Sequence, residues 1–297
     1  MSRLTFSPQR VVWVLIAIMS SLVSAAAPEL EVIYPAPESP ADVRYNDLVE
    51  ILHEALEHTA ATYGPYKVHP AHSVMNEARE LQTLEAGEEI NIAWSSTSDE
   101  KEQHLLPIRI PLRKGLLGYR IALISKDEQA LLDKVHDADD LRKFTIGQGI
   151  GWGDVALYNR NGFKVLTANY ENLFRMAEVR RFDLFPRGIG EVFKEYDEHV
   201  KLNPNLVVEQ HLLIQYPWPY YFFFNRKDTA LAERVETGLR AMMKDGTFDA
   251  IFRKYNGADI ERAKLGNRRI IRIVNPFLPK DTPLADKSLW FDPTTDK

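Results

Sequence analysis

The stretch FTIGQGIGWGDVALYNRNGFKV, residues 144–165, decides the fold class of this chain. Thr145–Gly147 reads as a short buried strand that runs into a glycine-rich turn. Residues 154–161 then have the composition of a helix, and Gly162 is placed to end it. Residues 163–166 are apolar enough for a second strand. This order predicts a βαβ unit with two parallel strands.

The same alternation continues on both sides of this unit. On the N-terminal side we expect a strand over 118–124 and an acidic helix over 131–144. On the C-terminal side we expect a helix over 171–179, a strand over 181–185 and a helix over 188–198. Strands that alternate with helices predict a three-layer α/β unit.

A second unit of the same kind precedes the first along the chain. We expect strands over 30–34, 66–69 and 90–94, and helices over 48–59 and 74–84. The first of these helices carries apolar residues at spacings of three and four, which places them on one face. The chain therefore contains two α/β units in sequence.

The C-terminal third follows a different pattern. Its long apolar run, 207–224, is interrupted by Tyr216-Pro217-Trp218-Pro219. Because proline cannot donate to a strand ladder, we expect two extended pieces that join at a crossing rather than one central strand. The remaining expected elements are helices over 231–244 and 248–255, the second ended by Gly257, a last strand over 269–274 and a surface tail from Asn275.

Composition excludes several classes of protein. The chain has 297 residues, 45% of them hydrophobic, so it is long enough for two packed lobes and unlike a disordered chain. A formal net charge of -5 gives no basic surplus for nucleic acid. The absence of cysteine excludes disulfides, thiolate-bound zinc, iron–sulfur clusters and a thiol nucleophile.

The catalytic motifs that come nearest to a match fail in spacing. His53–His58, HEALEH, resembles a zinc-protease helix, but its second histidine falls one residue late and leaves the shared face. The glycine-rich turn has Trp152 where a dinucleotide fingerprint needs glycine, and no Lys-Ser/Thr pair follows it. We therefore expect no enzyme, no catalytic residue, no metal and no cofactor.

Residues 1–25 have the pattern of a secretory signal. Arg3 and Arg10 precede the apolar run Val11–Met19, and the small residues Val23-Ser24-Ala25 follow. The run is too short for a membrane span, which needs ~20 residues. We expect cleavage after Ala25 and a soluble, periplasmic monomer.

Four segments together resemble the extracellular solute-binding proteins of family 3, the periplasmic amino-acid-binding type. The segments are 92–102 (IAWSSTSDEKE), 107–124 (PIRIPLRKGLLGYRIALI), 144–165, and 225–257 (NRKDTALAERVETGLRAMMKDGTFDAIFRKYNG). The resemblance implies a type II periplasmic-binding-protein-like fold, in which two three-layer α/β lobes are joined by two crossing strands. It places lobe one at 26–115 plus 219–297 and lobe two at 116–218.

The resemblance also implies a function. A solute-binding protein of this kind captures a small polar ligand, amino-acid-like or a carboxylate, between its lobes and serves an ABC-type transporter or a sensor in the membrane. Lys101 stands near the place where the family has an arginine that holds the α-carboxylate. The alternatives are an exported, dehydratase-like enzyme on the same fold and a ligand-free accessory module that docks on a membrane partner.

Arg187 is the first candidate for a ligand contact. It follows an expected strand and precedes an expected helix, at the sheet edge where open α/β folds bind ligands, and a guanidinium there can grip a carboxylate. A surface or inter-lobe ion pair is the alternative role. The other candidates come from the glycine-rich turn, the hydroxyl-rich loop, the first strand and the second crossing: Gln148, Gly149, Trp152, Asp154, Trp94, Ser95, Ser96, Thr97, Tyr34 and Tyr216. The alternative role is turn packing for the glycine-rich turn and helix capping for the hydroxyl-rich loop. For the first strand it is that of a core aromatic, and for the second crossing it is hinge packing.

Overall fold

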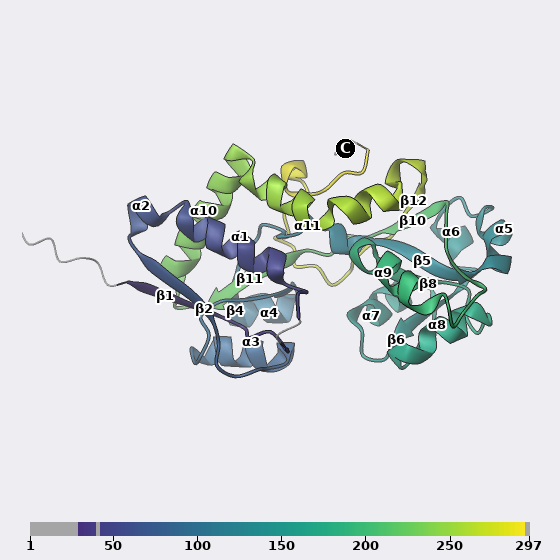
Figure 1. Cartoon of the computed structure of the whole chain (residues 1–297), viewed down its shortest axis with the longest axis horizontal. Coiled ribbons are helices and arrows are strands. Elements are labelled where there is room, and N and C mark those ends of the chain that lie inside the picture. Colours follow the sequence, from purple (N-terminus) through teal and green to yellow (C-terminus); the bar gives the residue numbers. More distant parts are fainter. Residues whose placement is uncertain (1–28, 40–41, 295–297) are drawn as a thin grey trace, which may run out of the picture.

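The computed structural model describes residues 29–39 and 42–294 of the chain. Its elements gather into two bodies, here called lobe one and lobe two, with a narrower region between them (Figure 1). The expected signal segment, 1–25, lies outside the described residues. No helix in the described part is long and apolar enough to cross a membrane.

Lobe one is built around β11 (Tyr220–Asn225), which lies between β3 and β4 and pairs antiparallel with both. Phe222 and Phe224 pack into a core with α1 and α10, while Tyr221 and Phe223 pack into a second core on the other face with α3. Burial of both faces explains why this run shows no alternation of polar and apolar residues. The other elements of lobe one are β1 (Leu30–Tyr34), α1 (Asn46–Glu57), α2 (Ala60–Tyr63), β2 (Tyr66–Pro70), α3 (Glu77–Ala86), β3 (Ala93–Ser96), α4 (Asp99–His104), β4 (Leu105–Ile108) and α10 (Thr229–Asp245).

Lobe two has a central strand of the same character, β5 (Tyr119–Ser125), which pairs antiparallel with β8, β9 and β10. Ile121 and Leu123 pack with α8 and α9 on one face, and Ala122 and Ile124 pack with α7 on the other. The other elements of lobe two are α5 (Gln129–Leu132), α6 (Ala138–Leu141), β6 (Thr145–Gly149), α7 (Gly153–Arg160), β7 (Lys164–Ala168), α8 (Tyr170–Glu178), β8 (Phe185–Gly188), α9 (Ile189–His199), β9 (Leu206–Val208) and β10 (Leu212–Gln215).

The predicted βαβ unit is present as β6, α7 and β7. The two strands are parallel and in register from Thr145 opposite Lys164 to Gly149 opposite Ala168. Gly162 follows the helix with a φ of 81°, a conformation that favours glycine. The stretch that predicted the α/β class therefore folds as expected.

Two crossing segments connect the lobes and hold each other. The N–H of Leu112 donates to the carbonyl of Tyr220 at 2.9 Å, and the N–H of Tyr216 donates to the carbonyl of Gly118 at 3.1 Å. A Cβ on Gly118 would lie 1.8 Å from the carbonyl oxygen of Tyr216, so only glycine permits this approach. Segments about a hundred residues apart in the sequence thus meet in the region between the two lobes.

The helix α11 (Thr247–Ala263) lies across both lobes (Figure 1). Phe248 and Ile251 belong to the core of lobe one, whereas Phe252 and Ala263 belong to the core of lobe two. One helix therefore contributes to the cores of both bodies.

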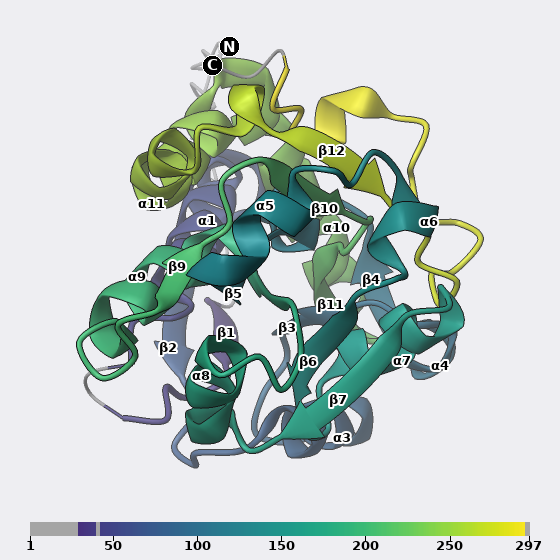
Figure 2. The same ribbon diagram turned by 90° about the vertical axis from the view of Figure 1, so that its right-hand side faces the viewer.

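The C-terminal segment adds a further connection. β12 (Arg269–Arg272) pairs parallel with β10 in lobe two (Figure 2), which departs from the expected assignment of 219–297 to lobe one. The chain then returns, so that Leu289 packs in lobe one and Phe291 packs in lobe two. The N–H of Phe291 donates to the carbonyl of Lys114 on the first crossing at 2.8 Å. We call 275–294 the C-terminal strap.

Three local predictions are wrong in detail. In place of the helix expected over 131–144, the chain forms the two short helices α5 and α6, because the Asp137 side chain accepts the N–H of Asp140 and starts a new helix. Gly257 lies inside α11 and does not end it. Arg187 lies within β8 rather than after a strand.

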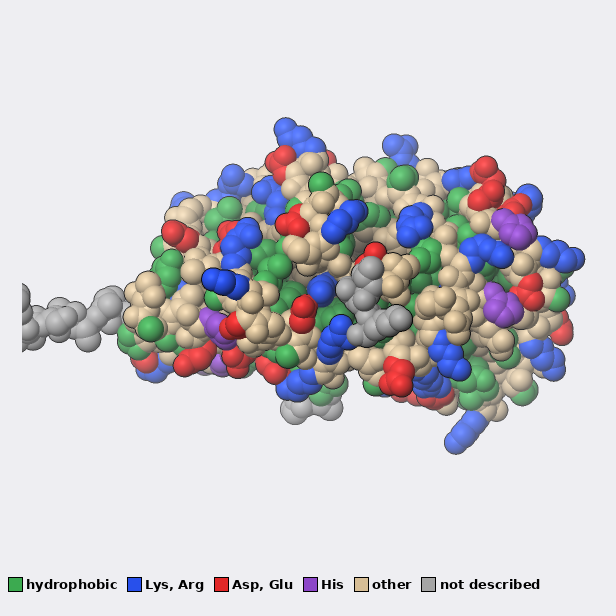
Figure 3. All heavy atoms as spheres, turned by 90° about the horizontal axis from the view of Figure 1, so that it is seen from above, with side chains coloured by type: hydrophobic (Ala, Val, Ile, Leu, Met, Phe, Trp, Pro, Cys, Tyr) green, Lys and Arg blue, Asp and Glu red, His purple; other side chains and the backbone are tan. Residues whose placement is uncertain are grey.

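The face that carries α10 and α11 is polar and mixed in charge (Figure 3). Basic and acidic side chains alternate over it, and apolar side chains show only as small separate areas. Such a surface is typical of a face that meets water rather than a broad apolar partner.

We expect Gly118→Ala to lower the free energy of unfolding by about 1–3 kcal/mol, because the new methyl group overlaps the backbone of the second crossing. Gly257→Ala is the matched control, since nothing lies within 4 Å of its added Cβ. The control is expected to be neutral or more stable by about 0.5–1 kcal/mol, the helix preference for alanine. Urea denaturation measures both, and equal stability of the two variants would contradict the crossing geometry.

Candidate functional site

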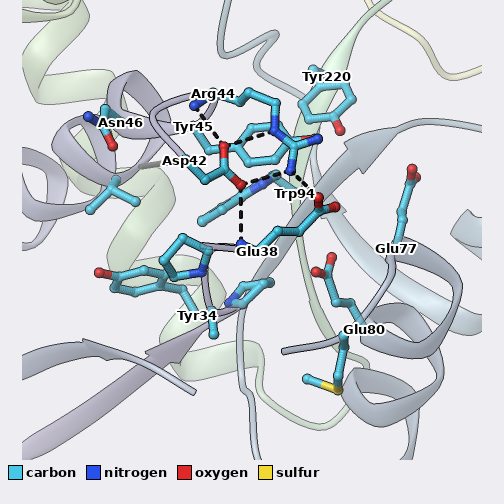
Figure 4. Close-up of a pocket in the computed structure, with 15 residues that line it drawn as sticks. Tyr34, Glu38, Asp42, Arg44, Tyr45, Asn46, Glu77, Glu80, Trp94 and Tyr220 are labelled. Carbon is cyan, nitrogen blue, oxygen red and sulfur yellow. Dashed lines mark hydrogen bonds and ion pairs between the residues drawn. The ribbon is translucent and has the colours of Figure 1, made fainter. Parts of the chain in front are cut away.

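A cavity of about 300 Å³ opens in lobe one where the end of β1, the start of α1, the start of α3 and β3 meet (Figure 4). Two of the predicted site residues, Tyr34 and Trp94, line it together. Tyr45 and Tyr220 complete an aromatic wall, the latter from the strand that follows the second crossing. We call this space the lobe-one cavity.

The aromatic rings of this cavity surround Trp94. The ring centroid of Tyr34 lies 5.9 Å from that of Trp94, and the ring centroid of Tyr45 lies 5.5 Å from it. Trp94 itself is buried and forms the floor, whereas the two tyrosines are half-buried and offer ring surface to the space. The four rings of the wall come from separate segments of the chain, so the fold assembles this wall.

Charged side chains cover the opposite side of the lobe-one cavity. Arg44 binds Asp42 through two hydrogen bonds of 2.7 and 2.8 Å and lies 3.0 Å from Glu38. Its guanidinium holds the pKa of Asp42 well below the usual range, mainly through these hydrogen bonds. Two of the four acidic groups that line the cavity thus share a single guanidinium as their partner.

Glu80 is the least compensated of these acids. Its carboxylate makes no hydrogen bond or ion pair with any residue in the part of the chain that the structure describes. Partial burial, with the nearby carboxylates of Glu77 and Glu38, raises the pKa of Glu80 to about 7. A positive charge in the cavity would lower the pKa of Glu80 again, because it favours the ionised carboxylate.

A second cavity, of about 270 Å³, lies between the lobes. Ser96, Thr97 and Lys101 line it from lobe one, and Gly153 and Ala156 line it from the first turn of α7 in lobe two. Trp218 of the second crossing and the start of the C-terminal strap complete it. We call this space the inter-lobe cavity, and it brings two predicted residues, Ser96 and Thr97, opposite the glycine-rich turn.

Lys101 connects the two cavities. Its ammonium donates to the hydroxyl of Ser95 at 2.5 Å, to the carbonyl of Ser96 at 2.9 Å and to Glu77 at 3.1 Å. Glu77 lines the lobe-one cavity while Lys101 lines the inter-lobe cavity. An ion pair therefore marks the boundary between a cavity rich in acids and a cavity with a cationic edge.

The guanidinium of Arg187 is occupied within lobe two. It binds Glu195 in bidentate fashion at 2.6 and 2.7 Å and lies 3.3 Å from Glu191. Burial alone would lower the pKa of Arg187, but these carboxylates outweigh it and raise the pKa. A ligand carboxylate would have to compete with Glu195 for the same donors, so the expected clamp role of Arg187 stays a prediction.

A second arginine belongs to the same buried network. Arg120 of β5 lies 3.3 Å from Asp154 and 3.5 Å from Glu191. Asp154, a predicted site residue, also accepts the hydroxyl of Tyr216 at 2.9 Å. The polar groups of Asp154 and Tyr216, both predicted to contact a ligand, are thus paired inside the protein. Tyr216 is also fully buried beside the crossing.

The glycine-rich turn is shaped by Trp152. A Cβ on Gly149 would lie 2.2 Å from the Trp152 ring, so this glycine allows the indole to fold back over the strand. The indole stacks on Phe185 and lies 4.5 Å below the Arg187 guanidinium, which is a cation–π contact. Gln148 is fully buried, and both polar atoms of its amide are without a partner among the described residues.

The residues of the lobe-one cavity that the sequence analysis missed include Tyr45, Glu77 and Glu80. The two glutamates are three residues apart on α3, which places them on one face of the helix, and that spacing was the available signal. Tyr45 directly precedes α1, and no sequence pattern marks it as lying beside Trp94. Long-range assembly, rather than local pattern, brings these side chains together.

One group of possible metal ligands lies far from the cavities, in lobe two: Asp133, Glu209 and His211. The carboxylate of Glu209 accepts the N–H groups of His211 and Leu212 at 2.9 and 2.6 Å, and Arg268 lies 3.3 Å away. Donors and a cation already saturate this acid, so the group does not fit a metal.

No model of a known protein family matches this sequence, and no curated protein matches it significantly. Solved structures do match in fold. YckB of Bacillus subtilis superposes with a TM-score of 0.53 at 15% sequence identity, over 82% of this chain and 96% of that chain. A structure from work on glutathione import via GshT and the cystine ABC importer TcyBC of Streptococcus mutans superposes with a TM-score of 0.52 at 14% identity, over 77% and 95%.

These likenesses confirm the predicted fold class. The chain has the two-lobed α/β fold of type II periplasmic binding proteins, and the resemblance found in the sequence holds at the level of fold.

We expect Arg187→Met to lower the free energy of unfolding by about 3 kcal/mol, because it leaves the carboxylate of Glu195 buried without its partner. Arg240→Met is the matched control, since Arg240 pairs with Glu236 on the exposed surface and such pairs contribute about 0–1 kcal/mol. Thermal and urea denaturation measure the difference. Equally small losses in both variants would show that Arg187 is not held as described.

Proposed function

We propose that this chain is a periplasmic solute-binding protein that holds a small, polar, amino-acid-like ligand between its two lobes and presents it to a membrane transporter or sensor. The observation that carries the proposal is the inter-lobe cavity, since residues of both lobes and of the second crossing line one space. A ligand that contacts both lobes is bound fully only when they are close together, so it shifts the population toward the closed form.

The inter-lobe cavity suits the carboxylate end of such a ligand. Lys101 contributes a positive charge, and the hydroxyl of Ser96 makes no hydrogen bond with a described residue. Across the space, α7 begins at Gly153, and the unsatisfied N–H groups of a helix start attract an anion. Lys101 and α7 together therefore support binding of an acid group.

The fold comparison supports a transport role in a general way. The Streptococcus mutans work concerns glutathione import through a cystine ABC importer. An amino-acid-like ligand for the present chain would belong to the same broad chemistry. Export to the periplasm rests on the signal pattern of residues 1–25.

The test begins with native mass spectrometry of the protein after export in a bacterial host, without refolding. We expect a protein that lacks residues 1–25 and carries a small compound in part of the population. Titration of that compound into ligand-free protein should then give a Kd that Lys101→Met weakens about tenfold, which corresponds to about 1.4 kcal/mol. Lys201→Met, which removes an exposed lysine of lobe two, is the control and should bind normally.

Three outcomes would contradict the proposal. Neither a co-purified compound nor a binder from a panel of amino acids and small carboxylates would argue for an accessory module without a ligand. Turnover of the bound compound would instead identify an exported enzyme. Equal affinity in the two lysine variants would move the acid-binding site away from the inter-lobe cavity.

A further inference from the structure

We propose that the lobe-one cavity receives a positively charged group, an ammonium or a guanidinium, so that the solute is an organic cation such as a basic amino acid. This inference rests on the proposed function and names the chemical class of its ligand. It concerns the lobe-one cavity, whereas the carboxylate site proposed above lies in the inter-lobe cavity.

The first argument is the charge of the cavity wall. Four acidic side chains line the lobe-one cavity, and Arg44 is the single basic residue among the described lining residues. Arg44 is engaged with Asp42 and Glu38, and Glu77 is engaged with Lys101. Glu80 has no such partner, so the wall keeps a net negative charge that a cation would balance.

The second argument is the direction of the acidic groups. Figure 4 shows the side chain of Glu80 extending from α3 toward the carboxylate of Glu38, while the side chain of Glu77 runs alongside. Glu80 is only partly exposed to water, which makes an unbalanced negative charge there costly. A carboxylate in this position gains more from a cationic ligand than an exposed one would.

The third argument is the aromatic wall. A cation over the face of a tyrosine or tryptophan gains ~0.5–2 kcal/mol, and half-buried tyrosine rings are exposed to this space. The ring of Tyr45 already attracts cations of the chain, because the guanidinium carbons of Arg44 and Arg113 lie 5.5 and 5.8 Å from its centroid. The same wall would repel an anionic group.

The fourth argument is the relation between the two cavities. Glu77 lines the lobe-one cavity, Lys101 lines the inter-lobe cavity, and the two side chains bind each other, so this ion pair links the walls of the two spaces. A ligand with its carboxylate near Lys101 and its cationic end near Glu80 would match both sides. A volume of about 300 Å³ in lobe one admits a side chain of the size of lysine or arginine.

The experiment compares cations with neutral compounds of nearly the same shape. L-arginine is paired with L-citrulline, and L-lysine with L-norleucine, in calorimetric titrations of the ligand-free protein. We expect each cation to bind at least about tenfold more tightly than its neutral partner, since a hydrogen bond to a charged group contributes ~1.5–3 kcal/mol.

Glu80→Gln is the decisive variant. It keeps the shape and removes the charge, and we expect it to weaken binding of the cations about tenfold while changing binding of the neutral compounds little. Folding is not at risk, because the substitution removes a charge whose ionisation is disfavoured in the native protein. Glu88→Gln is the control: Glu88 is exposed, lies on lobe one outside the cavity lining and should leave all four titrations unchanged.

Equal affinity for cationic and neutral partners, no binding of either cation at millimolar concentration, or an unchanged affinity in Glu80→Gln would each overturn the inference. The native mass spectrum separates this failure from failure of the proposed function. A neutral or anionic compound that co-purifies and depends on Lys101 leaves the solute-binding role in place and removes the cation site. A protein that binds no compound removes both.

Discussion

The contact between the two crossing segments is the constraint on which the rest of the molecule depends. Gly118 allows the backbone of the first crossing to lie against Tyr216 of the second, and the hydrogen bond between Leu112 and Tyr220 fixes their register. Each crossing leads directly into the central strand of a lobe, β5 or β11. The orientation of both cores, and hence the position of the cavities between and beside them, follows from this junction.

Two further elements limit how the lobes can move. The helix α11 packs into both cores, and the C-terminal strap places Leu289 in one and Phe291 in the other. Both lie along the side of the junction that carries the first crossing, as the bond from Phe291 to Lys114 indicates. For the closure proposed above, these restraints favour one direction of lobe movement.

The lobes differ in how they use charge. In lobe two, Arg120 and Arg187 are buried and paired with acids of the same lobe. Each arginine and its acid therefore satisfy each other's charge inside the protein. In lobe one, Glu80 stays without a partner beside an aromatic wall. The unbalanced group, rather than the strongest ion pair, is the one with free energy still to gain from a ligand.

Sequence patterns predicted the order of elements well, because each βα step is set by local periodicity and by glycines such as Gly162 at helix ends. They singled out Tyr34, Trp94, Ser96 and Thr97 because these residues lie at strand ends, where open α/β sheets bind ligands, but they assigned all four to one site. The structure divides them between the lobe-one cavity and the inter-lobe cavity. They could not show that Glu195 occupies Arg187, because this pairing depends on how α9 packs over β8. Nor could they find the place of β12, whose partner strand is about fifty residues away.

The central claim is that the lobes close on a ligand between them. Because the chain has no cysteine, this claim can be tested with two introduced labels. Pulsed electron spin resonance between spin labels at Arg79→Cys on α3 and Lys164→Cys on β7, both exposed, reports the distance between the lobes. The account expects this distance to shorten when the co-purified compound is added, and a distance distribution that stays the same at saturating compound would contradict it.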